Sequence, residues 1–71
     1  MANILVVDDS ALSRRVSRRI LEGAGHAVTE AADGLAALER YSIARPDLVL
    51  LDVTMADLDG LEVLRQLRAL D

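Results

Sequence analysis

LVLLDVTMADLDG, residues 48–60, is the stretch that decides the fold of this 71-residue chain. Its first four residues are apolar, Pro46 and Asp47 precede them, and they end at a carboxylate, Asp52. An apolar run of this length between turn residues predicts a buried strand over residues 48–51. Such a strand would bring Asp52 to its carboxyl end, where open parallel sheets carry their functional groups.

The same pattern occurs at the start of the chain and predicts the remaining elements. Four aliphatic residues, 4–7, run directly into Asp8 and Asp9, which is typical of a strand covered on both faces. Thr29 and Glu30 dilute the next apolar run and favour an edge strand there. The predicted elements are strand 3–7, helix 11–22, strand 27–31, helix 35–44, strand 48–51 and a third helix from near Gly60.

Helical spacing indicates which side of each helix faces the core. The apolar stripe of the first helix consists of Leu12, Val16, Ile20 and Leu21. Its arginines lie away from this stripe and predict a solvated face, comprising Arg14, Arg15, Arg18 and Arg19. The second helix is expected to pack through Leu35, Leu38, Tyr41 and Ile43.

This alternation of strands and helices with short loops predicts one α/β domain over residues 1–71 with a three-stranded parallel sheet. Right-handed crossovers favour the strand order 2-1-3. That order places the strand over residues 48–51 at an edge, although its sequence carries no charged or proline protection. Further strands or another chain are expected to cover it.

Composition excludes several classes of function. The net charge is −4 and all eight positive residues are arginine, so nucleic-acid or anionic-membrane binding is not expected. The chain has no cysteine, which removes disulfides and thiolate zinc sites. No apolar run approaches the length of a membrane span, and the N-terminus lacks the pattern of a signal peptide. A soluble cytoplasmic protein is the simplest interpretation.

Three carboxylates are predicted to meet at one edge of the sheet. If the first and third strands are neighbours, Asp8, Asp9 and Asp52 converge at their carboxyl ends, where each pair repels by on the order of 1–4 kcal/mol. A hard divalent cation such as Mg²⁺ would remove that repulsion and could hold an incoming phosphoryl group, which a carboxylate could then accept. The alternative is that these residues are only turn and helix-capping residues.

VVDDS at residues 6–10 and LVLLDVTMADLDGLEVLRQLR at residues 48–68 resemble the response-regulator receiver domain of two-component signalling. The resemblance implies a flavodoxin-like fold with strand order 2-1-3-4-5 and a histidine kinase as phosphoryl donor. It implies that Asp52 is the phosphoacceptor, that the protein is not an enzyme, and that Mg²⁺ is held by Asp8, Asp9, Asp52 and the backbone carbonyl of Thr54. A haloacid-dehalogenase-type phosphatase needs a second aspartate two residues after the first, where this chain has Ser10 and Thr54.

The resemblance covers only the first three βα units of a receiver, so the chain is expected to be a truncated half-domain. In the family, the fourth strand ends in a threonine or serine and the fifth in a lysine, and this chain contains no lysine. The alternative function is therefore self-association of a half-domain into a homodimer through exposed aliphatic surface. The residues predicted to form that surface are Leu12, Val16, Val49 and Leu51.

Overall fold

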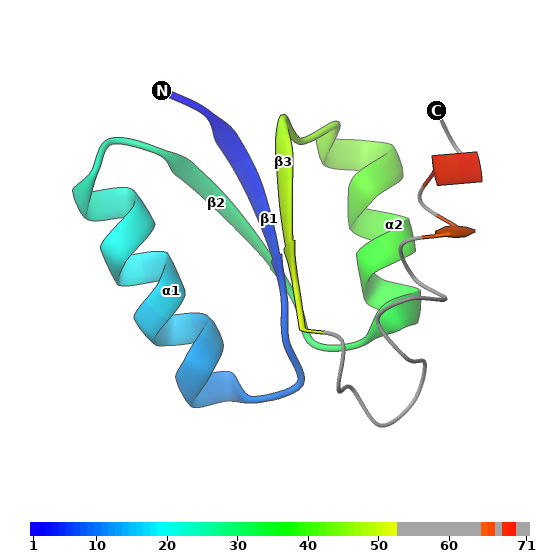
Figure 1. Cartoon of the computed structure of the whole chain (residues 1–71), viewed down its shortest axis with the longest axis horizontal. Helices are drawn as coiled ribbons and strands as arrows, with labels where there is room; N and C mark the ends of the chain where they lie inside the picture. Colours follow the sequence, from blue (N-terminus) through cyan, green and yellow to red (C-terminus); the bar gives the residue numbers. More distant parts are fainter. Residues whose placement is uncertain (53–64, 67, 70–71) are drawn as a thin grey trace.

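The computed structural model describes residues 1–52, 65–66 and 68–69 of the chain. Its elements are β1 (Asn3–Val7), α1 (Ala11–Gly23), β2 (Ala27–Ala31), α2 (Gly34–Ala44) and β3 (Leu48–Leu51). The strands are parallel in the order β2-β1-β3, and α1 and α2 cover opposite faces of the sheet (Figure 1). The predicted strands and their order are confirmed. The third helix, predicted from near Gly60, begins outside the described residues and stays a prediction.

The register of the sheet aligns the carboxyl ends of its strands. Val7 lies opposite Ala31 of β2 on one side and opposite Leu51 of β3 on the other. Backbone pairing continues one residue further, because the Asp8 amide donates to the Ala31 carbonyl (3.1 Å) and the Asp52 amide donates to the Val7 carbonyl (2.9 Å). The residues that follow β1 and β3 therefore emerge at the same level.

The core lies between the sheet and α2. Its fully buried residues are Leu5, Val7, Ala31 and Ala37, and partly buried Ala36, Leu38, Tyr41, Val49 and Leu51 pack against them. Of the predicted contacts of α2, Leu38 and Tyr41 are correct, whereas Leu35 and Ile43 are 76% and 79% exposed. Small residues take their place, since Gly34 and Ala37 are the buried residues of α2 and let the helix backbone approach the strands.

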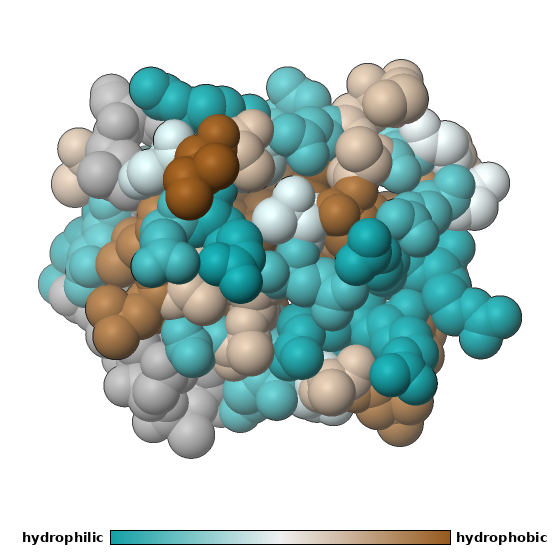
Figure 2. All heavy atoms as spheres, turned by 180° about the vertical axis from the view of Figure 1, so that it is seen from behind, coloured by the Kyte–Doolittle hydropathy of each residue, from teal (hydrophilic) through white to brown (hydrophobic). Residues whose placement is uncertain are grey.

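Of the predicted apolar stripe of α1, only Leu21 lies among the less exposed positions of the helix. Leu12, Val16 and Ile20 are exposed, and α1 has no fully buried residue. Its less exposed positions are Arg14, Ser17 and Leu21, which recur at helical spacing. The physical reason is that Glu30 of β2 faces α1 and turns arginines of the helix toward the sheet. From behind, the exposed apolar residues appear as separate brown patches among hydrophilic ones (Figure 2).

Local signals fix where the helices begin and end. The Ser10 hydroxyl accepts a hydrogen bond from the Ser13 amide (3.2 Å), and the Asp33 carboxylate accepts one from the Ala36 amide (2.7 Å). These caps satisfy amides at the first turns of α1 and α2. Helix α2 ends at Ala44, and its C-cap residue Arg45 has a φ of 49°, in the left-handed region. Among the described helices, neither is long and apolar enough to cross a membrane.

Candidate functional site

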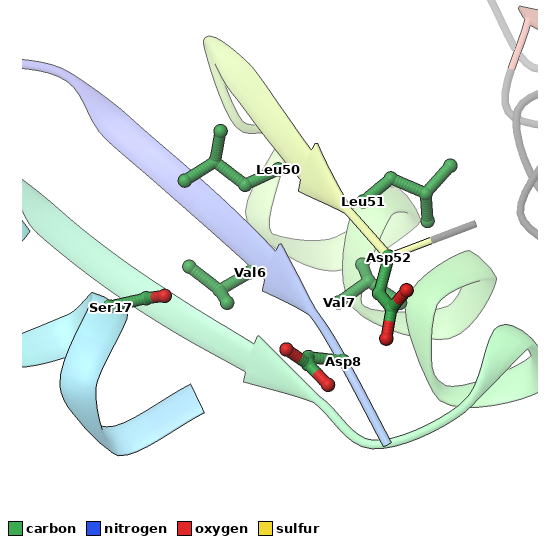
Figure 3. A pocket seen from close by; sticks show the side chains of 7 residues that line it. All are labelled: Val6, Val7, Asp8, Ser17, Leu50, Leu51 and Asp52. Carbon is green, nitrogen blue, oxygen red and sulfur yellow. The ribbon is translucent and has the colours of Figure 1, made fainter. Parts of the chain in front are cut away.

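The carboxylates of Asp8, Asp9 and Asp52 meet beyond the ends of β1 and β3. One oxygen from each side chain lies within 4.8 Å of an oxygen from each of the other two. Asp8 and Asp52 are partly buried and Asp9 is exposed. Figure 3 shows the side chains of Asp8 and Asp52 reaching into the same space from neighbouring strands. The predicted convergence of these three acids is therefore present in the fold.

Backbone hydrogen bonds set the position of Asp8. Its amide is tied to β2 through the Ala31 carbonyl (3.1 Å), and one of its carboxylate oxygens accepts from the Ser10 amide (2.9 Å). The second of these bonds closes a local turn of the type that aspartate favours. Asp8 is thus held by the sheet on one side and by the start of α1 on the other.

Polar and apolar residues of β1, β3 and α1 line a pocket beside these acids. Besides Asp8 and Asp52, the pocket is lined by Val6, Val7, Ser17, Leu50 and Leu51. Val6 and Leu50 lie on the α1 side of the sheet together with Ser17, whereas Val7 and Leu51 point to the other side (Figure 3). Asp8 and Asp52 are partly buried, so their charges are screened less than those of fully exposed carboxylates.

An ion-pair network joins β2, α1 and the acidic loop, and the sequence interpretation missed it. Arg14 Nε lies 3.2 Å from a carboxylate oxygen of Glu30, and Arg18 Nη1 lies 2.7 Å from the other oxygen. The hydrogen bond from Arg18 holds the pKa of Glu30 below its ordinary value, with Arg14 adding to the effect and desolvation opposing it. The prediction of a solvated face is wrong for Arg14, whose side chain is 17% exposed, whereas Arg18 is 44% exposed and agrees with it. An acidic residue in a strand is a sequence signal for such a pairing.

The remaining predicted site residues are distributed differently. Thr54 lies outside the described residues. Leu12 and Val16 are exposed on α1, while Val49 and Leu51 are partly buried against the core beneath α2. The side chains of β3 that are exposed belong to its other face, and they are Leu48 (51%) and Leu50 (39%).

Three closely spaced carboxylates suit a small divalent cation. Mg²⁺ binds oxygen at about 2.0–2.1 Å, so two oxygens on opposite sides of one ion lie about 4 Å apart. The observed limit of 4.8 Å between ligand oxygens is compatible with this geometry after small side-chain rotations. Hard anionic oxygens are the donor type that Mg²⁺ prefers. The residues present therefore fit a magnesium site made by Asp8, Asp9 and Asp52.

Comparisons with known proteins point in one direction. The sequence model of the response regulator receiver domain matches residues 4–71. The chain is 53% identical over 66 residues to response regulator MprA of Mycobacterium sp. (strain KMS), covering 93% of this chain and 29% of that protein. It is 40% identical to chemotaxis protein CheY of Listeria monocytogenes, covering 100% of this chain and 60% of that protein.

A solved structure agrees with these sequence matches. The response regulator protein TrrA of Thermotoga maritima, crystallised in complex with Mg²⁺ and BeF, superposes with a TM-score of 0.94 at 35% identity. The match covers 100% of this chain and 62% of that one. The chain thus spans less than two thirds of the length of each of these proteins.

Proposed function

The chain belongs to the response regulator receiver domain family, and on this premise we propose that it accepts a phosphoryl group on Asp52 beside a bound Mg²⁺. The observation that carries the proposal is the meeting of Asp8, Asp9 and Asp52 within 4.8 Å at the carboxyl ends of adjacent parallel strands. The Mg²⁺ and BeF bound by TrrA, a structural relative at 35% identity, support the same assignment.

The three acids are proposed to have different roles. One carboxylate oxygen of Asp8 accepts a hydrogen bond from the Ser10 amide, and a side chain held in this way suits a fixed metal ligand. Asp9 is exposed and supplies a second ligand. Asp52 lines the pocket at the end of β3, where a phosphoryl group could approach it. Bound Mg²⁺ would offset the negative charge of the incoming group at this site.

The proposed reaction is a transfer between two protein side chains. A carboxylate oxygen of Asp52 forms a bond to phosphorus while the P–N bond to a phosphohistidine of the donor breaks, and the electron pair of that bond returns to the imidazole. The product on this chain is an acyl phosphate. In this proposal the partner is a histidine kinase, the chain is a receiver of the group and not an enzyme, and its location is cytoplasmic.

The experiment uses a small phosphodonor so that no kinase is required. We expect acetyl phosphate with Mg²⁺ to add the mass of one phosphoryl group to the chain, and Asp52→Asn to abolish that addition. Asp33→Asn is a matched control, because Asp33 follows the neighbouring strand β2 and caps α2. Intact-mass spectrometry measures the outcome. An unmodified wild-type chain, or equal modification of the Asp52→Asn variant, would contradict the proposal.

A second candidate function is self-association, and exposed aliphatic side chains favour it. Leu12 is 71% exposed on α1, and Leu48 and Leu50 are exposed on the same face of the sheet as that helix. Within the described residues, β3 pairs only with β1, so its outer edge offers unpaired backbone groups. A second copy of the chain would cover both features in a twofold dimer.

Light scattering after size exclusion tests this second candidate at micromolar concentration. We expect a dimer mass for the 71-residue chain and a monomer mass for Leu48→Lys. Leu35→Lys is the matched control, because Leu35 is 76% exposed on α2, at the opposite face of the sheet. A folded wild-type monomer across the concentration range would exclude self-association.

A further inference from the structure

Arg14 contacts both the ion-pair network and the acidic pocket. Its Nε pairs with Glu30 at 3.2 Å, and its Nη1 donates a hydrogen bond of 2.7 Å to the backbone carbonyl of Asp8. The side chain is only 17% exposed, compared with 44% for Arg18. Because a guanidinium presents its donors in a rigid planar fork, these two contacts fix the distance between β2 and the loop that carries Asp8.

The contact with Asp8 completes the set of bonds that hold this residue. The amide of Asp8 is bonded to Ala31, its carboxylate is bonded to Ser10, and its carbonyl is bonded to Arg14. Two of these three bonds come from the backbone of adjacent segments. The third comes from a side chain whose loss would free the carbonyl and allow the peptide plane between Asp8 and Asp9 to turn. The orientation of that plane decides where the Asp9 carboxylate points.

Coulomb interactions alone do not explain a guanidinium at this position. A positive charge beside a cation site repels the cation and would weaken its binding. Glu30 offsets this effect, because its carboxylate is bonded to both Arg14 and Arg18. The arrangement keeps the geometric contact to Asp8 while reducing its electrostatic penalty.

We propose that Arg14 is a positioning residue for the pocket, which holds Asp8 and Asp9 in the orientation that binds a divalent cation. The inference rests on the proposed function, because Mg²⁺ is its ligand. Its action is indirect: Arg14 contacts a backbone oxygen of a ligand residue, and Glu30 anchors Arg14. Partners of this kind typically change metal affinity by about 10–100-fold when they are removed.

The test compares the Mg²⁺ affinity of variants by isothermal titration calorimetry. We expect Arg14→Gln to bind Mg²⁺ about tenfold more weakly than wild type. Arg18→Gln is the matched control, because Arg18 pairs with the same Glu30 from the same helix without a contact to Asp8. It is expected to match wild type. A purely electrostatic role predicts the opposite sign for Arg14→Gln, namely tighter binding, because a positive charge is removed.

Each outcome has a distinct meaning. Arg14→Gln binding as well as Arg18→Gln, or more tightly than wild type, would overturn the inference and leave the magnesium site intact. Wild type without a Mg²⁺ signal would overturn the proposed metal site and the inference with it. If far-UV circular dichroism shows that Arg14→Gln is unfolded, the Mg²⁺ affinity of Arg14→Lys is measured in its place. Its single ammonium cannot reproduce the forked contact, so weaker binding supports the role of Arg14 and wild-type affinity refutes it.

Discussion

Glu30 illustrates how one polar residue in a strand can organise its surroundings. Its carboxylate faces α1 from β2, where it binds Arg18 with one oxygen and Arg14 with the other. An unpaired carboxylate at this partly buried position would lose hydration and so destabilise the folded state. The two arginines reduce that cost, and the less exposed positions of α1 are accordingly Arg14, Ser17 and Leu21, of which only Leu21 belongs to the predicted apolar stripe.

The first prediction concerns the pH dependence of this contact. The folded chain holds the pKa of Glu30 below its ordinary value of 4.5, mainly through the Arg18 hydrogen bond. The stabilisation is therefore complete above that ordinary value and is lost as the pH falls through the lowered pKa. We expect the difference in free energy of unfolding between wild type and Glu30→Gln to be constant near neutral pH and to shrink in acid.

Urea denaturation across a pH series measures this difference. Glu39→Gln is a matched control for the loss of a carboxylate, because Glu39 lies on α2 with a side chain that is 71% exposed and pairs with the adjacent Arg40. A Glu30→Gln difference that keeps the same size from neutral to acidic pH would contradict the pairing.

At the scale of secondary structure elements, strands were more predictable than helix faces. Runs of four aliphatic residues define β1 and β3, because a short apolar run between turn residues has few other solutions. The acids after these runs were predictable as a site for the same reason, since parallel neighbours place their carboxyl ends together. The face of α1 was harder to predict, because it depends on a contact between Arg14 and Glu30 that joins a helix to a strand, and the acidic residue in the strand signals a pairing without identifying its partner.

Element boundaries lead to the second prediction. Asp33 caps α2 through a 2.7 Å hydrogen bond from the Ala36 amide, and α2 carries Ala37, Leu38 and Tyr41 of the core. We expect Asp33→Ala to lower the free energy of unfolding by about 1 kcal/mol, whereas Asp33→Asn retains an accepting oxygen and costs less. Chemical denaturation of the three proteins measures the effect. Equal stability of Asp33→Ala and wild type would show that the cap contributes nothing.

At the scale of the whole molecule, the small core makes bound ions important. Among the described residues, six apolar residues are buried and four of them form one cluster, and a chain of this size has a narrow margin of stability. Repulsion among the three carboxylates of the pocket lowers that margin of stability further. A ligand that binds only the folded chain therefore shifts the folding equilibrium measurably.

The third prediction is that Mg²⁺ stabilises the fold. At a concentration ten times its Kd, Mg²⁺ should raise the free energy of unfolding by about 1.4 kcal/mol, and chelation should reverse this rise. Asp9→Asn should differ from wild type in two respects. It should be more stable without metal, because one repelling charge is gone, and its stability should rise less when Mg²⁺ is added. Thermal unfolding with and without Mg²⁺ measures both. A wild-type melting temperature that is insensitive to Mg²⁺ would contradict the prediction.

The register of β1 against β3 has a consequence for the order of events during folding. Asp8 and Asp9 belong to the first strand of the sheet and Asp52 to the last described one, so the pocket forms only when a contact distant in sequence closes. Local pieces, such as the cap of α1 at Ser10, can form earlier without creating a metal site. The onset of Mg²⁺ binding in a refolding experiment would therefore time the docking of β3, independently of the helical signal.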